Sequence, residues 1–431
     1  MSVPSSIPWT KDFRVAIVGG GIGGLFCAIS LRKSGVPFDI FEAAAQFGEV
    51  GAGIGFAPNA EEAMRYLGIF EDYMQAANHR ESYSLILGNE TQDHVADILP
   101  RGGPITSIHR ARMLNILLEH VPSECAHLKK RCVRVEQVST DPQAPLYRVH
   151  FHDGTTHEAN LVIGADGIRS VVRQSVLGHR VEPRYVGTRA YRGIFPADEW
   201  LKTVGPEYAS GLLIISGLGK HLIIFPIDGN LINLVGFISD PREKRFVEGT
   251  DILPVGEPWV QPASHDQALS DFADMPGPFV KTAFKSIEHM TVWKIHSLWP
   301  ALPTYVKDGI ALLGDAAHGM TPHCGQGAGQ ALEDSYILGR LLGHPKTTLQ
   351  TLHSSLVIYD EVRRPRGNKV LEYSLETGDV WDGWGPNGES NEGRKLDADG
   401  RLDWIWEHNI SEDGERAIAI LEARDGAPPV M

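Results

Sequence analysis

The sequence predicts an α/β fold in which a Rossmann-like nucleotide-binding domain is interrupted by a mixed or antiparallel β-sheet. Near the N-terminus, a strand, a glycine-rich turn, a helix and a second strand follow one another within residues 15–42. From about residue 180, strand-like runs such as 221–226 and 231–238 dominate, and a buried-strand pattern returns at 310–313. The inserted sheet therefore divides the nucleotide-binding part in two.

The first strand leads into Gly19, Gly21 and Gly24, spaced as in the dinucleotide-binding turn Gly-x-Gly-x-x-Gly. The first glycine permits the tight turn, the second lets backbone approach a pyrophosphate, and the third lets helix and strand pack closely. The following helix offers free N–H groups to phosphates. Glu42 ends the second strand, where a carboxylate accepts ribose hydroxyls. The alternative is a glycine-rich turn of another α/β protein.

Composition argues against several classes of protein. The 431 residues are 42% hydrophobic, enough for a large core in two or three structural units. A net charge of −14 argues against binding to nucleic acid or to an anionic membrane. The four cysteines are scattered, as expected of free thiols in a reducing compartment. We find no signal peptide or membrane-spanning run, so we expect a cytoplasmic protein. The sequence leaves open whether it is a monomer or a homodimer.

The chain is expected to form three parts. They are a discontinuous nucleotide-binding domain over 1–180 and 296–345, a substrate-binding β-sheet domain over 181–295, and a C-terminal helix and tail over 346–431. Within the last part, the pattern predicts a helix at 348–375 and a long loop at 379–400.

Two further motifs follow the N-terminal turn. Residues 164–173 read Gly-Ala-Asp-Gly-Ile-Arg-Ser-Val-Val-Arg, and residues 314–323 read Gly-Asp-Ala-Ala-His-Gly-Met-Thr-Pro-His. In this order the three motifs resemble the single-component FAD-dependent aromatic hydroxylases, the para-hydroxybenzoate hydroxylase-like superfamily. The glycine-rich run 314–329 is most similar to the salicylate hydroxylase-type branch. The resemblance covers roughly residues 12–375 and implies a GR2-type FAD-binding domain.

The resemblance implies FAD as cofactor and NADH or NADPH as transient electron donor. Asp315 follows a buried strand, where its carboxylate would accept a ribityl hydroxyl or, alternatively, only cap a helix. Gly327 and Ala328 open a helix whose N–H groups would face the flavin ring. Arg110 matches an arginine of the family that contacts the flavin.

Two more residues are expected at the cofactor. Asp166 matches the family's Asp-Gly motif, which serves both FAD and NAD(P)H, although a structural turn is the alternative. Gly55 belongs to a second glycine cluster, 51–55, which would let backbone approach a large planar ligand. Alone, that cluster is also typical of an ordinary loop.

The implied reaction is hydroxylation of a small aromatic substrate with O₂ through a flavin C4a-hydroperoxide. Because the transferred oxygen is electrophilic, the protein must favour an electron-rich phenolate and exclude water. Arg192 begins the inserted sheet and is the expected partner of a phenolate or carboxylate. His221 and Phe225 share a strand face. We expect His221 to be a polar contact or base and Phe225 to form an apolar wall. Pro322 and His323 lie beside the flavin turn and would line the reactive edge.

The leading expectation is salicylate-type oxidative decarboxylation to a catechol. A phenol-ring hydroxylase, a dearomatase or an epoxidase of a biosynthetic pathway is the first alternative. Related dearomatising enzymes carry a tyrosine where Phe225 stands, which argues against the dearomatase. An FAD-binding reductase or redox sensor is an alternative of another class. No metal site is expected, because His318 and His323 flank no cysteine or carboxylate pair.

Overall fold

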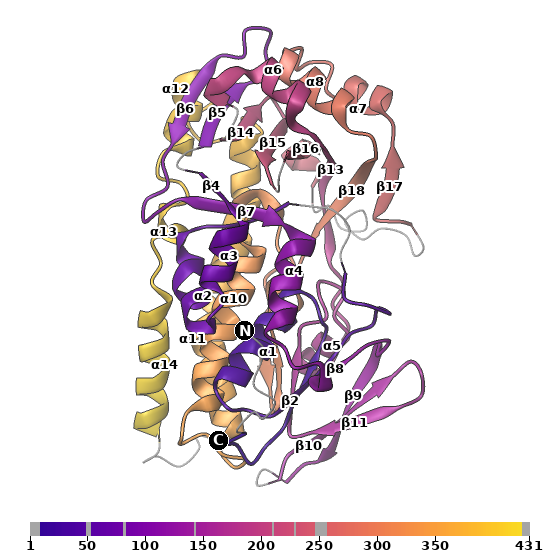
Figure 1. The fold of residues 1–431 in the computed structure, drawn as a ribbon, viewed down its shortest axis with the longest axis vertical. Coiled ribbons are helices and arrows are strands. Elements are labelled where there is room, and N and C mark those ends of the chain that lie inside the picture. Colours follow the sequence, from indigo (N-terminus) through magenta and orange to yellow (C-terminus); the bar gives the residue numbers. More distant parts are fainter. Residues whose placement is uncertain are drawn as a thin grey trace.

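Two large β-sheets, one above the other in Figure 1, organise the fold. The structure is a computed structural model that describes residues 9–48, 53–80, 83–141, 144–208, 211–227, 230–245 and 257–424. Gly51 of the second glycine cluster lies outside the described residues.

The lower sheet is the predicted nucleotide-binding sheet. Its strand order is β19-β20-β12-β1-β2-β8, and all its pairs are parallel except β19 with β20. Every residue of β1 and β2 is buried, as parallel strands covered on both faces require. The bounds are β1 Val15–Val18, β2 Phe38–Phe41, β8 Ala126–His127, β12 Leu161–Gly164, β19 Val306–Lys307 and β20 Ile310–Leu312.

Helices and two small sheets surround this layer. Helix α1 packs against α10 beside the parallel strands. The helices are α1 Ile22–Lys33, α2 Glu61–Leu67, α3 Phe70–Ala76, α4 Arg110–Glu119, α5 Val172–Leu177, α9 Asp315–His318 and α10 Gly327–Gly343. One small sheet has the order β11-β10-β9 and the other β3-β7-β4. Their strands are β3 Gly53–Phe56, β4 Asn78–Arg80, β7 Ile105–His109, β9 Cys132–Ser139, β10 Leu146–Phe151 and β11 Thr156–Ala159.

The upper sheet has eight strands in the order β17-β18-β13-β16-β15-β14-β5-β6. All pairs are antiparallel except β14 with β5, so the sheet is mixed. The bounds are β5 Tyr83–Leu87, β6 His94–Ile98, β13 Arg184–Pro196, β14 Leu212–Ser216, β15 Lys220–Pro226, β16 Leu231–Ser239, β17 Val260–Ala263 and β18 Met290–Ser297.

The upper sheet differs from the prediction in one respect. Strands β5 and β6 come from residues 83–98, which the sequence assigns to the nucleotide-binding domain. The assignment is wrong because a short hairpin carries no local feature that tells which of two sheets it joins. The upper sheet is therefore built from two separate parts of the chain.

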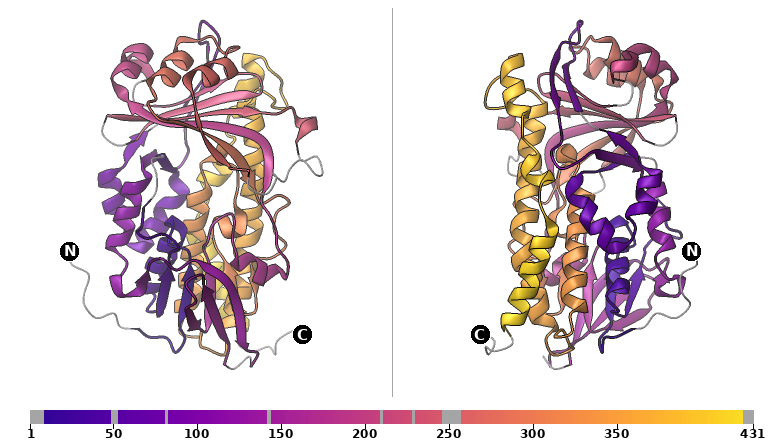
Figure 2. Two further views of the ribbon diagram at one scale, coloured as in Figure 1. Left: turned by 90° about the vertical axis from the view of Figure 1, so that its right-hand side faces the viewer. Right: turned by 60° about the vertical axis from the view of Figure 1, so that its left-hand side comes forward.

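The two faces of the upper sheet have different neighbours. Helices α6 Ala197–Tyr208, α7 His265–Asp271 and α8 Pro278–Ser286 cover the outer face (Figure 2, left). Along β15, Leu222 and Ile224 belong to the apolar core that includes Phe284 of α8. Because side chains alternate along a strand, Ile223 and Phe225 face the other way, towards the nucleotide-binding layer.

The C-terminal part contains more helix than predicted. Helix α11 Leu352–Trp381 runs along both layers, and α12 Asn391–Ala398, α13 Asp403–Trp406 and α14 Ile410–Arg424 follow it (Figure 2, right). The predicted loop at 379–400 is wrong, because Ser390 caps α12 and Arg394 donates to the Gly217 carbonyl at 3.2 Å. The Arg394 contact joins residues 177 positions apart, and such a contact leaves no apolar periodicity in the sequence. No helix among the described residues is long and apolar enough to span a membrane.

Candidate active site

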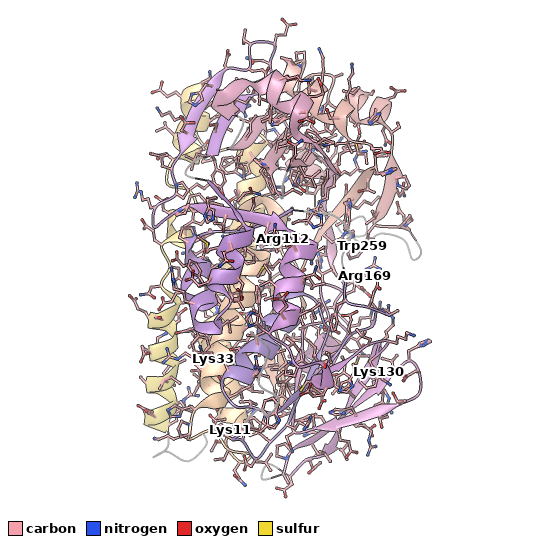
Figure 3. The ribbon with its side chains drawn as sticks, in the orientation of Figure 1. Lys11, Lys33, Arg112, Lys130, Arg169 and Trp259 are labelled. Carbon is pink, nitrogen blue, oxygen red and sulfur yellow. The ribbon has the colours of Figure 1, made fainter. Side chains whose placement is uncertain are left out.

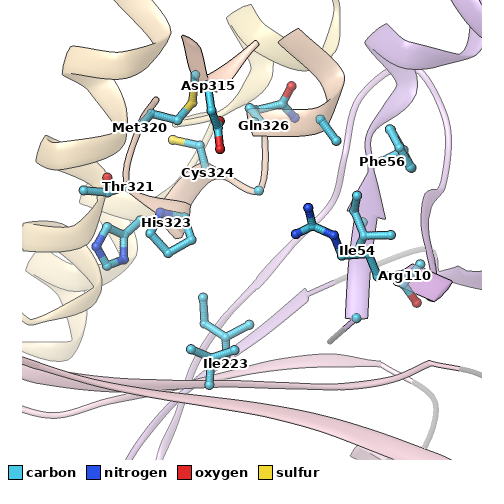
Figure 4. Close-up of a pocket in the computed structure, with 18 of the residues that line it drawn as sticks. Ile54, Phe56, Arg110, Ile223, Asp315, Met320, Thr321, His323, Cys324 and Gln326 are labelled. Atoms are coloured by element: carbon cyan, nitrogen blue, oxygen red, sulfur yellow. The ribbon is translucent and has the colours of Figure 1, made fainter. Parts of the chain in front are cut away.

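A cavity of about 530 Å³ lies between the two layers. Its lower wall comes from the first glycine turn, strand β3 and residues 313–328, and its upper wall from strands of the large sheet. In Figure 4, Arg110, Ile223 and His323 surround a common space from three sides, with Asp315 and Gln326 above it.

The three glycines of the N-terminal turn have different physical roles. Gly19 has φ +110°, and a Cβ on it would lie 2.2 Å from the Ala165 carbonyl oxygen. A Cβ on Gly24 would lie 2.0 Å from the Gly19 carbonyl oxygen, so close packing requires both glycines. Gly21 lines the cavity, and a Cβ there would meet no protein atom within 4 Å. The space beside Gly21 at the start of α1 therefore fits a pyrophosphate.

Glu42 is fixed next to this turn. Its Oε2 accepts a hydrogen bond from the Gly20 N–H at 2.8 Å, and its Oε1 accepts one from the Ala44 N–H at 2.7 Å. The carboxylate lies beside the turn rather than on the wall of the main cavity. Gly55 of β3 does line the cavity wall.

Asp166 has a structural role. Its Oδ1 accepts a hydrogen bond from the Ser170 hydroxyl at 2.5 Å, and its Oδ2 accepts one from the Val171 N–H at 2.7 Å, next to the start of α5. Burial raises the pKa of this carboxyl, while these hydrogen bonds oppose the rise. Its neighbours Ala165 and Gly167 line the cavity, but Asp166 does not. The cofactor contact predicted for Asp166 is not supported, because the carboxylate caps the following helix.

Asp315 and the start of α10 face the cavity together. Among the described residues, none forms a hydrogen bond or ion pair with the Asp315 carboxylate, which is thus available to a ligand hydroxyl. Gly327 and Ala328 line the same wall at the first positions of the 17-residue helix α10. A helix N-terminus offers N–H groups and positive potential there.

A buried ionic network that the sequence did not predict supports this wall. Glu333 and Asp334 of α10 pair with Arg363 of α11, with Oε2 to Nη1 at 2.7 Å and Oδ1 to Nε at 2.8 Å. Asp334 also accepts a hydrogen bond from the Gly314 N–H at 3.0 Å, directly before Asp315. The network fixes the turn that carries Asp315. The partners lie about 30 residues apart in the chain, so no local motif indicates it.

Two arginines enter the cavity from opposite layers. Arg110, the first residue of α4, lines the cavity; burial lowers its pKa and nearby Asp315 opposes that shift. Arg192 of β13 lies in a row across the sheet with Val235 of β16 and Ile223 of β15. Burial, and secondarily the charge of Arg110, lowers the pKa of Arg192 to about 10. The two cations together give the cavity a positive potential.

The Arg192 guanidinium lacks an acidic partner. Among the described residues, none makes a hydrogen bond or ion pair with it, and its Nε is buried without a partner. Its contact is instead with Trp293, whose ring centroid lies 5.0 Å from Cζ. A buried, unpaired cation that faces a cavity is the group expected to bind an anionic ligand.

The remaining predicted substrate residues divide into two groups. The first group lines the cavity and consists of Phe225, Pro322 and His323. Burial holds the pKa of His323 well below its usual value, and electrostatic interactions with His221, Arg245 and Arg192 lower it further. His323 is therefore a neutral imidazole at neutral pH.

His221 does not reach the cavity. Its side chain is fully buried, its Nδ1 lies 2.7 Å from Asp382 Oδ1, and it stacks on Phe237 with centroids 4.6 Å apart. The predicted substrate contact is wrong because the end of α11 covers this end of β15. Asp382 is 161 residues away in the chain, so the sequence did not indicate the pair. His221 therefore supports the cavity wall from behind, because Phe237 and His323, whose ring centroid lies 5.2 Å from that of His221, both line the cavity.

Comparison with known proteins identifies the family of this chain. A family model described as an FAD binding domain matches residues 12–374. A salicylate hydroxylase of Pseudomonas putida is 38% identical over 95% of this chain and 95% of its own length. The chain belongs to the FAD-dependent aromatic hydroxylases. The enzyme is therefore an FAD-dependent aromatic monooxygenase, as the three motifs predicted.

Other comparisons agree with this family. The 6-methylsalicylate 1-monooxygenase of Aspergillus terreus is 31% identical over 96% of this chain and 93% of its own length. The solved structure described as a salicylate hydroxylase substrate complex superposes with a TM-score of 0.82 at 33% identity, covering 94% of this chain and 98% of that one. These likenesses confirm the predicted fold class and the cofactor FAD.

Proposed function

We propose that the enzyme converts a small phenolic acid of the salicylate type into a catechol and releases the carboxylate as CO₂. The observation that carries the proposal is the unpaired Arg192 guanidinium in an otherwise largely apolar cavity. A carboxylate is the anion that pairs best with a guanidinium edge, because two parallel N–H···O bonds can form. The similarity to enzymes named for salicylate and 6-methylsalicylate supports the same class of substrate.

The residues present fit FAD. The turn at Gly21 would hold the pyrophosphate, because it leaves open space beside the backbone. The carboxylates of Glu42 and Asp315 would accept hydroxyls of the cofactor, and Arg110 and the N-terminus of α10 would supply positive charge. When bound and reduced by NADH or NADPH, FAD supplies an electrophilic oxygen derived from O₂.

The protein's own side chains would prepare the aromatic ring. In this proposal Arg192 holds the carboxylate, and a ring nitrogen of neutral His323 accepts a hydrogen bond from the phenol hydroxyl. The hydroxyl, polarised by this hydrogen bond, pushes electron density to the neighbouring ring carbon, which bears the carboxylate. Ile223, Phe225 and Val235 form an apolar wall that excludes water from the ring. Attack at the carboxylated carbon then allows CO₂ to leave.

Oxidation of NADH and NADPH against a panel of hydroxybenzoates tests the proposal. Slow oxidation alone and strong stimulation by salicylate, with catechol as product, is the expected result. Stimulation that yields a product retaining the carboxylate would favour a ring hydroxylase. A rate that no aromatic acid changes would contradict substrate-gated hydroxylation altogether.

The four cysteines are free and buried, which supports a reducing compartment such as the cytoplasm.

A further inference from the structure

A tryptophan covers the arginine proposed to bind the carboxylate. Trp293 of β18 pairs with Ala190 of β13, while Arg192 pairs with Thr291, so Trp293 and Arg192 are diagonal neighbours on the cavity face. The guanidinium carbon lies 5.0 Å from the indole centroid. The indole Nε1 donates to the Thr291 hydroxyl at 2.9 Å, which fixes the plane of the ring.

Trp293 occupies the boundary between cavity and solvent. It lines the cavity and is nevertheless 37% exposed, which is unusual for so large an apolar side chain. Stacking over an indole face leaves the in-plane N–H edges of a guanidinium free for a carboxylate. The positive charge of Arg110 repels the guanidinium and lowers the pKa of Arg192. The attraction between the guanidinium and the indole face opposes this repulsion. The contact therefore orients Arg192 without consuming its hydrogen-bond donors.

We propose that Trp293 positions Arg192 and sets substrate specificity by limiting the size of a substituent next to the carboxylate. The inference rests on the proposed function. A group on the ring carbon adjacent to the carboxylate lies beside the carboxylate oxygens, and hence beside whatever surrounds the guanidinium. The indole of Trp293 lies within 5.0 Å of the guanidinium carbon and lines the same cavity. An unsubstituted phenolic acid would fit against the indole, and a methyl group at the adjacent carbon would contact it.

Two ratios measured on the FAD-loaded enzyme test this inference. The first is kcat/KM for 6-methylsalicylate divided by that for salicylate. The second is the affinity for 2-methylbenzoate relative to benzoate, measured from the change in flavin absorbance, which requires no turnover. In Trp293→Leu both ratios are expected to rise about tenfold, the usual effect of one methyl group in a pocket. The affinity for benzoate itself should fall about three- to tenfold, because the cation–π contact is lost.

Two variants serve as controls. Trp293→Phe keeps an aromatic face over Arg192 and should largely restore the affinity for benzoate. Trp259→Leu removes another tryptophan of the cavity wall, but one that stacks on His296 at 3.6 Å and lies under Arg169 at 3.7 Å (Figure 3). It should leave both ratios unchanged.

The outcomes separate this inference from the proposed function. Unchanged ratios in Trp293→Leu, or equal changes in Trp259→Leu, would overturn the role of Trp293. If the wild-type enzyme binds benzoate but decarboxylates neither salicylate, the proposed reaction fails. In that case the two benzoate affinities still decide whether Trp293 controls the position next to the carboxylate.

Discussion

Replacing Arg192 with methionine is expected to stabilise the folded protein while it destroys substrate binding. Burial, and secondarily the charge of Arg110, lowers the pKa of Arg192 to about 10, so the folded protein disfavours the charged form. At neutral pH, below both the ordinary and the lowered pKa, this cost is fully present. At about 1.4 kcal/mol per pKa unit, this cost amounts to at most about 3 kcal/mol. Methionine removes the charge and keeps an apolar contact with Trp293.

Binding should respond in the opposite direction. Without Arg192, a substrate carboxylate enters the cavity unpaired, which costs about 3–5 kcal/mol, or at least about 100-fold in kcat/KM. Urea unfolding of the substrate-free holoenzyme and the dissociation constant of salicylate measure the two effects. Arg192→Lys retains a charge and should show no stabilisation and a smaller loss of affinity. A methionine variant that is less stable than the wild type and still binds salicylate normally would refute the reasoning.

Three further perturbations test other parts of the account. Gly21→Ala should weaken FAD binding about tenfold or more without loss of folding. Gly24→Ala places a Cβ 2.0 Å from a carbonyl oxygen and should therefore reduce the yield of folded protein. FAD titration measures the first effect and circular dichroism the second. His323→Gln should lower kcat/KM about 100-fold, and the wild-type pH profile should show no loss near pH 6.5, because the pKa of His323 lies well below that value. Burial lowers the pKa of His296 to about 4, so on acidification the unfolded chain takes up a proton before the folded protein does. The free energy of unfolding should therefore fall by up to about 3 kcal/mol between pH 6.5 and pH 4. In His296→Phe, unfolding measured as a function of pH should lack this part of the loss.

Local backbone patterns made much of the fold predictable. Gly19 and Gly24 are required by contacts with neighbouring backbone, and such contacts leave the same spacing in any sequence that forms this turn. Asp315 follows closely after the buried strand β20, which ends at Leu312, so its position near the end of that strand could be inferred. Pro322 and His323 follow in the same turn.

Long-range contacts account for what the sequence did not indicate. The pairing of His221 with Asp382 joins residues 161 positions apart and turns an expected substrate contact into a buried support. Asp166 carries the expected motif, yet its carboxylate is used to cap a helix. The contact of Trp293 with Arg192 depends on the register of β13 with β18. That register shifts between Tyr185 and Arg189, and no sequence pattern specifies the shift.

The most direct test follows the carboxyl carbon of salicylate. With salicylate labelled at that carbon, NAD(P)H and O₂, the enzyme should release labelled CO₂ and form unlabelled catechol in equal amounts, each matching the NAD(P)H consumed. Label retained in a dihydroxybenzoate, or NAD(P)H consumed with no aromatic product, would contradict oxidative decarboxylation at a site where Arg192 holds the carboxylate.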